Sequence, residues 1–457
     1  MSQANSKTEL FESMPIPKAV MQLSIPIVLS SLVSIVYNLA DTFFVGMLND
    51  PIQNAAVTLV YPVMLAFNAV NNLFGVGTSS MMSRALGSGD HEKVRKCSVF
   101  GFYGALFSGL LFSLVCTVLR TPLLHLLGAD SSTLDVTGNY MFWTVCCGAM
   151  PAILNVVQGY MVRSEGASLH ASIGTMSGCI LNILLDPIFI LPWGLNMGAA
   201  GVGLATFLSN CFACGYFLVL ARVKRGKTFV CMDIRKLKTV TKDIVLGIFG
   251  VGIPASIQNL LNVVGSTILN NFTAAYGASA VAAMGVAQKL NMIPMQMGMG
   301  FSQGIMPLVS YNYASGNSKR MKRSILFAAG IVVPFMLTVT AFYYFGAPTL
   351  IRLFMDNAEI VDYGSRFLRG MCLASTFLCV DFLAVGVFQS LGMGRNALIF
   401  AVLRKVVLEI PLLFLMNAAW PLYGLPYAQV IAEVILAAAA VVMLRRIFRQ
   451  ADRLQGA

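Results

Sequence analysis

Two aspartates interrupt long apolar stretches of the sequence, and each has a polar neighbour one helical turn before it. Asp41 follows Tyr37 by four residues, and Asp186 follows Asn182 by four residues. Residues four apart lie on one face of an α-helix. Carboxylates inside a bilayer are costly and mark ion pathways or proton relays. We therefore predict that these four residues form a binding site for H⁺ or Na⁺.

A purely structural explanation is open at this point. Asp186 directly precedes Pro187, so it could cap or bend a helix there. Asp41 could be a satisfied polar contact, with Asn38 expected on the same helix face as Tyr37 and Asp41.

The second half of the chain has its own ionisable residues within apolar stretches: Lys289, Asp381, Glu409 and Glu433. Lys405 lies four residues before Glu409, and we expect these two to pair on one helix. Asp381 has no such neighbour. It is our second candidate for binding a cation or a cationic substrate.

Three methionines, Met292, Met295 and Met299, keep close to one face of an expected helix. Flexible thioethers suit a cavity that accepts apolar ligands of different shapes. Filling gaps in a core is the alternative, so these residues support a substrate cavity only as one of two interpretations.

Motifs for catalysis are not recognisable in the chain. Gly226-Lys-Thr228 resembles the end of a phosphate loop, but Ala221 stands where that loop needs a glycine. Cys211 and Cys214 form a Cys-x-x-Cys pair without a second pair or a nearby histidine, so we expect them to pack as small hydrophobes. We predict no enzymatic activity, no catalytic residues, no metal and no cofactor, and transport driven by an ion gradient or by the gradient of the solute itself.

The composition says where these residues must lie. Of 457 residues, 57% are hydrophobic and only 11% are charged, against about 25% charged in soluble domains. Such a chain cannot cover a soluble core with polar residues, and it is too apolar to be disordered. We predict an all-α integral membrane protein.

Polar breaks divide the sequence into stretches long enough to cross a bilayer, which takes about 20 residues as a helix. We predict twelve spans, at about 21–48, 54–82, 97–119, 134–158, 168–192, 197–222, 243–272, 279–309, 324–345, 362–388, 396–417 and 422–447.

The positions of the basic residues give the direction of these spans. If the N-terminus is cytoplasmic, 24 of the 31 basic residues lie on the cytoplasmic side. The opposite side has four: Arg120, Arg352, Arg366 and Arg369. Because Lys and Arg accumulate in cytoplasmic loops, we predict that both chain ends are cytoplasmic.

The two halves of the sequence repeat each other. Pro26 and Pro254 each open a long span, and Gly89-Asp90 corresponds to Gly316-Asn317, at an offset of about 225–228 residues. Each half has six spans, so the halves are parallel repeats about an axis along the membrane normal. We predict an N-terminal segment (1–20), an N-lobe (21–222), a basic linker (223–242), a C-lobe (243–447) and a cytoplasmic tail (448–457).

The order of the motifs over about residues 15–447 resembles the multidrug and toxic compound extrusion (MATE) transporters. The resemblance is carried by Ile25-Pro26, Tyr37-Asn-Leu-Ala-Asp41-Thr-Phe-Phe-Val-Gly46, Arg84-Ala-Leu-Gly-Ser-Gly89-Asp90, Asn182-Ile-Leu-Leu-Asp186-Pro187, Gly198-Ala-Ala-Gly201 and Gln303-Gly-Ile-Met-Pro307. The pair Asn182 and Asp186 resembles the DinF-like branch of that family.

This resemblance implies a MATE fold with two six-helix lobes, and export of organic, often cationic, drugs in exchange for H⁺ or Na⁺. It implies a bacterial cytoplasmic membrane protein that acts as a monomer, binds small molecules and lipid, and binds no nucleic acid. The DinF-like pattern adds Thr206 to the predicted ion site. Another branch of the family has acids in the seventh and tenth helices, where this chain has Asn262 and Asp381. A flippase for lipid-linked precursors, from the same superfamily, is the alternative function.

Overall fold

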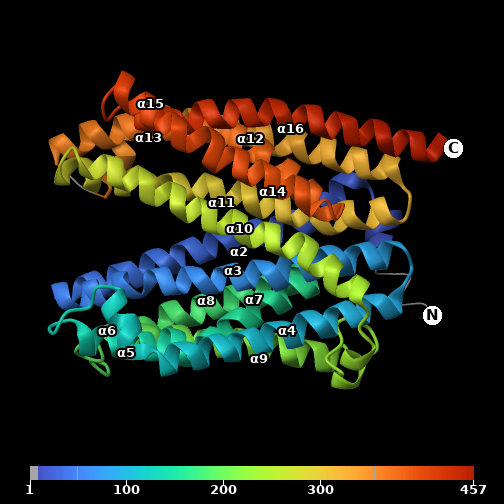
Figure 1. The fold of residues 1–457 in the computed structure, drawn as a ribbon, viewed down its shortest axis with the longest axis horizontal. Helices are drawn as coiled ribbons and strands as arrows, with labels where there is room; N and C mark the ends of the chain where they lie inside the picture. Colours follow the sequence, from blue (N-terminus) through green and yellow to red (C-terminus); the bar gives the residue numbers. More distant parts are fainter. Residues whose placement is uncertain (1–8, 49, 355–356, 457) are drawn as a thin grey trace. The chain divides into compact units, whose positions relative to one another are not determined.

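The computed structural model describes residues 9–48, 50–354 and 357–456 and consists mostly of long helices (Figure 1). No β-strand occurs among the described residues. The helices of the first half are α2 (Ile16–Met47), α3 (Pro51–Gly87), α4 (His91–Val118), α5 (Arg120–Leu126), α6 (Leu134–Met141), the π-helix η1 (Phe142–Cys147), α7 (Ala149–Ser164), α8 (Ser168–Ile190) and α9 (Ala199–Val223). Those of the second half are α10 (Lys242–Ala274), α11 (Ala278–Ala314), α12 (Ser318–Arg352), α13 (Ala358–Ser390), α14 (Gly394–Val402), the π-helix η3 (Leu403–Glu409), α15 (Ile410–Ala419) and α16 (Leu425–Gly456), with the 3₁₀-helix η2 (Ile234–Thr239) between the halves.

Each of the twelve predicted spans falls on one long helix or on one run of consecutive helices. Within the described residues, nine helices are long and apolar enough to cross a membrane, and the bent run from Leu134 to Ser164 makes ten. The other two predicted spans fall on α11 and on the run α14–η3–α15. Hydropathy and length alone therefore identify fewer spans than the polar breaks do.

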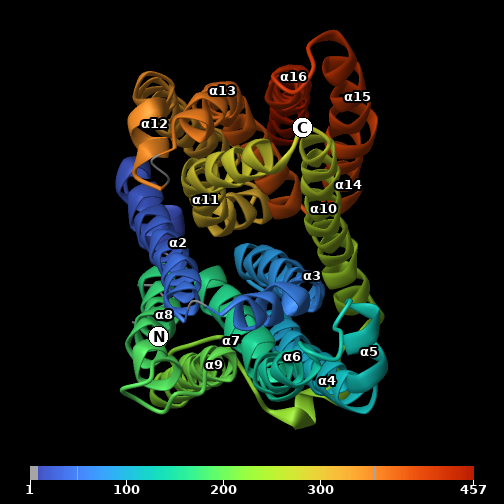
Figure 2. The same cartoon turned by 90° about the vertical axis from the view of Figure 1, so that its left-hand side faces the viewer.

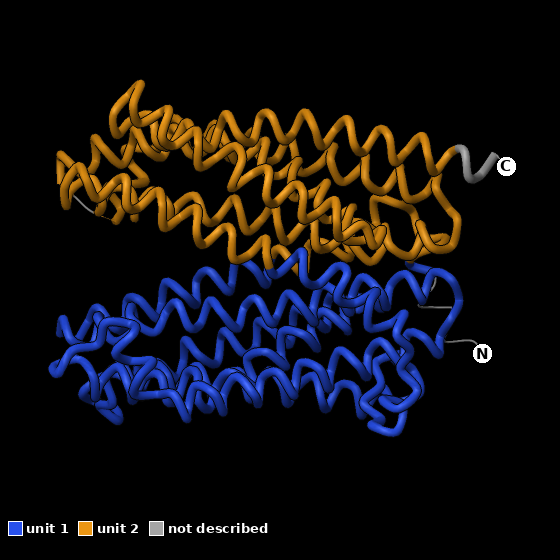
Figure 3. Tube along the Cα trace, in the orientation of Figure 1, with its two compact units in different colours: residues 1–10, 29–256 blue, residues 11–28, 257–457 orange. Residues whose placement is uncertain are grey.

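Contacts divide the chain into two compact units, coloured separately in Figure 3. Unit 1 comprises residues 1–10 and 29–256, and unit 2 comprises residues 11–28 and 257–457. These limits differ from the predicted lobes, because α2 and α10 each contribute to both units. Both helices pass from one unit to the other two residues after a proline, Pro26 or Pro254. A proline inside a helix removes one backbone hydrogen bond and permits a bend.

Close backbone contacts hold both helices just before these prolines. Within unit 1, a Cβ at Gly252 of α10 would lie 2.0 Å from the Leu73 carbonyl oxygen of α3. Within unit 2, a Cβ at Gly304 of α11 would lie 2.6 Å from the Ser24 Cα of α2. Only glycine permits such approaches.

The predicted repeat is visible in equivalent local structures. The Ser83 hydroxyl donates to the Ser164 carbonyl oxygen over 3.1 Å in unit 1. The Ser310 hydroxyl donates to the Ser390 carbonyl oxygen over 2.9 Å in unit 2. The two donor residues are 227 positions apart in the chain (310 − 83), and the two acceptor residues are 226 positions apart (390 − 164). The repeat therefore extends to individual hydrogen bonds.

The turns between helices repeat as well. Gly89 and Gly316 both have φ +76°, a left-handed conformation that favours glycine. Each is followed by a residue that caps the next helix: Asp90 accepts a hydrogen bond from the Lys93 amide, and Asn317 accepts one from the Arg320 amide.

One helix in each unit packs against at least three others, as α7 does in unit 1 (Figure 2). In unit 1, α7 packs against α3, α4, α8 and α9. In unit 2, α13 packs against α11, α12 and α16 and is the most buried of the apolar spans. α7 and the second half of α13 are equivalent in the repeat, so the same helix forms both cores.

The predicted basic linker packs on unit 1. The Glu165 carboxylate, which is 4% exposed, accepts hydrogen bonds from the Thr228 hydroxyl and from the backbone amides of Phe229 and Val230. The Tyr103 hydroxyl donates to the Met232 carbonyl oxygen. Polar side chains of the helices thus hold this loop in place.

Candidate functional site

The two aspartates predicted to bind an ion lie together in unit 1. Asp41 projects from α2, Asp186 from α8, and Asn182 lies one turn before Asp186. With the Asn182 amide group oriented to satisfy its neighbours, its nitrogen donates to Asp41 Oδ1 over 2.9 Å and to Asp186 Oδ2 over 3.1 Å. One amide therefore connects both carboxyl groups.

The remaining predicted members of the site complete this arrangement. In the same orientation, the Asn182 carbonyl oxygen accepts a hydrogen bond of 3.1 Å from the Thr206 backbone amide of α9. The Tyr37 side chain, one turn before Asp41 on α2, lies next to Asp41 and to the Thr206 side chain. Three helices, α2, α8 and α9, thus bring together all five residues that the sequence assigned to the site.

The surroundings of the two acids are unusual for side chains that can carry a charge. Asp186 is fully buried and Asn182 is 1% exposed. The two carboxyl groups lie within hydrogen-bonding distance of each other, and Asp186 Oδ1 has no protein hydrogen-bond donor. No Lys, Arg or His of the described part of the chain contacts either acid. Two adjacent acids without a basic partner among the described residues are the arrangement expected of a proton or cation site.

Asp186 does not cap the end of a helix, because α8 continues through Pro187 to Ile190, and its side chain contacts Asn182 and Asp41. Asn38 lies apart from the site: its side chain is exposed and donates to the Ser34 carbonyl oxygen over 2.7 Å. Among the described residues, no group of three His, Cys, Asp or Glu side chains could hold a metal ion.

The second candidate, Asp381, has a partner that the sequence pattern did not reveal. Arg404 of η3 donates to Asp381 Oδ2 of α13 over 2.9 Å and to Asn262 Oδ1 of α10 over 2.7 Å. Asp381 and Arg404 are 1% and 2% exposed. The guanidinium therefore occupies the space between the two residues that the sequence proposed for a second cation. Lys289 is exposed on α11 and makes no contact with them that the structure records.

The predicted pair of Lys405 and Glu409 is confirmed, with 2.6 Å between Nζ and Oε2. Glu433 lies on α16, inside a helix as predicted, and we had assigned it no role. It is fully buried near these charges. Neither of its carboxylate oxygens has a hydrogen-bond partner among the described residues. The isolated acid in an apolar helix was the only signal for it. Met292, Met295 and Met299 are half-buried on α11.

Comparison with known proteins agrees with this architecture. The model of the family described as MatE matches residues 26–188 and again residues 254–415. The second match begins 228 residues after the first (254 − 26), in agreement with the predicted repeat. Together the two matches cover most of the chain.

Curated relatives cover nearly the whole chain. A multidrug export protein MepA of Staphylococcus saprophyticus is 32% identical over 434 residues, which is 95% of this chain and 94% of that protein. A MepA of Staphylococcus aureus is 33% identical over 437 residues, with the same coverage.

Solved structures have the same fold. One described as the outward-facing conformation of a multidrug resistance MATE family transporter has a TM-score of 0.92 and 26% identity, and 98% of each chain is covered. A transporter of the MOP superfamily from Pyrococcus furiosus, described as having a binding pocket of reverse polarity that suggests a different function, has a TM-score of 0.90 and 25% identity, covering 97% of this chain and 98% of that one. The chain belongs to the MatE family and has the fold of the MATE transporters.

Proposed function

We propose that this chain is a secondary active multidrug efflux transporter, which exports organic, often cationic, compounds in exchange for H⁺ or Na⁺. The observation that carries the proposal is the cluster of Asp41, Asn182 and Asp186, in which two acids share an amide and no basic residue of the described chain contacts them. Asn182 and Asp186 are buried, and Asp41 is half-buried. The staphylococcal relatives bear the name multidrug export protein, which supports the same substrate class.

Asp41 and Asp186 bind the coupling ion in this proposal, and Tyr37, Asn182 and Thr206 support them. Two negative charges in a low-dielectric interior repel each other strongly. One H⁺ or Na⁺ removes most of that repulsion, so loading and unloading the ion changes the stability of the contact between α2 and α8. A contact of this kind can be linked to a change in conformation.

The Asn182 amide gives the site two arrangements. With its nitrogen toward the acids it is a donor, which suits carboxyl groups with one proton or none. In the reversed orientation the nitrogen donates to the Thr206 hydroxyl over 3.3 Å, and the carbonyl oxygen is turned toward the acids. Hard cations prefer oxygen ligands, so this second arrangement suits Na⁺.

Alternating access requires helices that can bend. We propose hinges in α2 and α10 near Pro26 and Pro254, because both helices change units two residues beyond these prolines. We assign the coupling ion to unit 1 alone, because Arg404 already compensates the charge of Asp381 in unit 2.

The membrane orientation is part of the proposal. We propose a monomer in the bacterial cytoplasmic membrane, with both chain ends in the cytoplasm, no enzymatic activity and no nucleic-acid partner. The support is the placement of 24 of the 31 basic residues on one side of the predicted spans.

Gradient-driven uptake of a cationic dye into everted vesicles, which corresponds to efflux from the cell, tests the assignment. Asp41→Asn and Asp186→Asn should each reduce gradient-driven transport by roughly tenfold or more. Asp135→Asn, at an exposed residue of α6, is the matched control and should leave it unchanged. Full efflux by both site variants would show that the assignment is wrong. Proton and sodium gradients imposed separately identify the coupling ion.

A further inference from the structure

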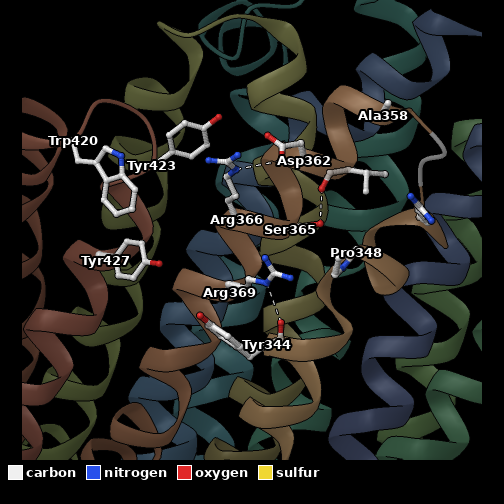
Figure 4. A pocket seen from close by; sticks show the side chains of 12 residues that line it. Tyr344, Pro348, Ala358, Asp362, Ser365, Arg366, Arg369, Trp420, Tyr423 and Tyr427 are labelled. Carbon is white, nitrogen blue, oxygen red and sulfur yellow. Dashed lines mark hydrogen bonds and ion pairs between the residues drawn. The ribbon is translucent and has the colours of Figure 1, made fainter.

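Unit 2 contains a cavity of about 540 Å³ at the end where α12 finishes and α13 and α16 begin (Figure 4). Its volume is in the range of small-molecule sites, about 300–1,000 Å³. Three arginines line it: Arg352 of α12, and Arg366 and Arg369 of α13. Asp362 is the one acid among the described residues of the lining. These described residues have a formal charge of +2 (3 − 1).

Three arginines at one cavity are more than the rest of the predicted non-cytoplasmic side would suggest. The predicted topology places only four basic residues opposite the cytoplasm, and three of them line this cavity. The fourth is Arg120, which belongs to unit 1. Because basic residues are disfavoured on that side, gathering three of them at one cavity calls for a local reason.

Each of the two α13 arginines makes one hydrogen bond through its Nε, which leaves its two terminal nitrogens available. Arg366 Nε donates to Asp362 Oδ1 over 3.2 Å, and Arg369 Nε donates to the Tyr344 carbonyl oxygen over 3.1 Å, as Figure 4 shows. No protein acceptor among the described residues is recorded for the terminal nitrogens of either guanidinium. These planar donor groups are suited to bind phosphate oxygens in pairs.

Aromatic rings form the rest of the lining. The Arg366 guanidinium lies 4.8 Å from the centroid of the Tyr423 ring, and the Trp420 and Tyr427 rings stack at 5.5 Å. Leu422, between Trp420 and Tyr423, has φ +62°, a conformation rare for leucine. The turn that carries these rings is thus held in a specific shape by its surroundings. Trp and Tyr with this mixed character gather at membrane interfaces.

We propose that this cavity binds the phosphate group of an anionic phospholipid from the non-cytoplasmic leaflet, with the aromatic rings in contact with its glycerol region. Three guanidinium groups and a single carboxylate favour an anion, and the position at helix ends places it at headgroup depth. The proposal depends on the membrane orientation given above but not on the ion site, because its test does not measure transport.

Binding of defined lipids to the purified full-length protein tests the proposal. Native mass spectrometry and thermal melting are measured with phosphatidylglycerol, with zwitterionic phosphatidylethanolamine and with inorganic phosphate. Phosphatidylglycerol should be retained and should raise the melting temperature, and phosphatidylethanolamine should do neither. The double variant Arg366→Gln/Arg369→Gln should weaken retention of phosphatidylglycerol at least about fivefold.

A control of equal charge separates a specific site from general attraction. Arg120→Gln/Arg323→Gln removes two basic residues outside the cavity and should retain the lipid as the unaltered protein does. Equal weakening in both double variants would overturn the proposal. Full competition by inorganic phosphate would overturn the lipid assignment and identify a soluble anion as the ligand. The single variant Arg366→Lys keeps the charge but loses the paired donors, and an intermediate loss of affinity is expected even if the double variant does not fold.

Discussion

Asp41 and Asp186 lie on different helices, α2 and α8, 145 residues apart in the chain, and the nitrogen of the Asn182 amide donates to both. The Asn182 amide occupies the position from which a basic residue would neutralise Asp41 and Asp186. The two acids are therefore held together by a neutral group, which is the arrangement that the proposed ion-coupled transport needs.

Replacement of Asn182 tests whether this connection is essential. Asn182→Leu removes the donor to both acids and the acceptor for the Thr206 amide, which should lower gradient-driven efflux roughly tenfold. The loss of stability should be about 1–3 kcal/mol, because buried acids lose a partner. Asn38→Leu is the control at an exposed position of α2. Equal efflux by both variants would contradict the role assigned to Asn182.

The loop before α6 supplies a pH-dependent prediction outside the membrane. Hydrogen bonds from the Ser132 and Thr133 side chains and from the Thr133 amide lower the pKa of Asp130 to about 2. Its folded-state pKa is below the unfolded value of about 3.9. The contribution of Asp130 to stability is therefore complete above the unfolded pKa and is lost as the pH falls through about 2.

Asp130→Asn should remove this dependence. A ¹³C carboxyl titration of the unaltered protein should show Asp130 ionised down to about pH 2, and hydrogen exchange of residues 130–134 should accelerate below pH 4. The variant should show no such change with pH. An Asp130 midpoint near the unfolded value would refute the predicted stabilisation of this loop.

The helical spacing of Tyr37, Asp41, Asn182 and Asp186 was enough to predict which side chains gather at the candidate site. Spacing of four residues determines which side chains share a helix face, and acids are rare enough in the membrane to be noticed. Spacing along one helix does not predict contacts between helices. The Arg404 interaction with Asp381 joins residues 23 positions apart, from η3 and α13, and it was missed for that reason.

The limits of the two units were not predictable from composition either. Hydropathy indicates where a span begins and ends, so we predicted the boundary between the two lobes in the basic linker. The contacts place the changes near Pro26 and Pro254 instead, inside α2 and α10, because tertiary packing decides which neighbours a helix segment has. The sequence repeat had marked the same two prolines as equivalent.

The pair of Arg404 and Asp381 gives a prediction about stability. Arg404→Leu leaves a carboxylate that is 1% exposed without its partner, which should destabilise the protein by about 3–5 kcal/mol. The double variant Asp381→Leu/Arg404→Leu removes both charges and should recover most of that loss. Thermal melting of the single and double variants measures the difference. No recovery in the double variant would mean that Arg404 stabilises unit 2 through other contacts, such as the bond to Asn262.

Replacement of Glu433, unlike that of Arg404, should leave the stability almost unchanged. The neighbouring charges already balance, because Arg404 and Lys405 offset Asp381 and Glu409. A further negative charge on a fully buried side chain without hydrogen-bond partners would be costly, so we expect Glu433 to be uncharged in this state. Glu433→Gln should then change stability by less than about 1 kcal/mol, whereas Glu409→Gln, which leaves Lys405 unpaired, should cost about 3 kcal/mol. Melting of both variants at pH 7 decides between these outcomes: a larger loss for Glu433→Gln than for Glu409→Gln would mean that Glu433 is ionised and balances Arg404.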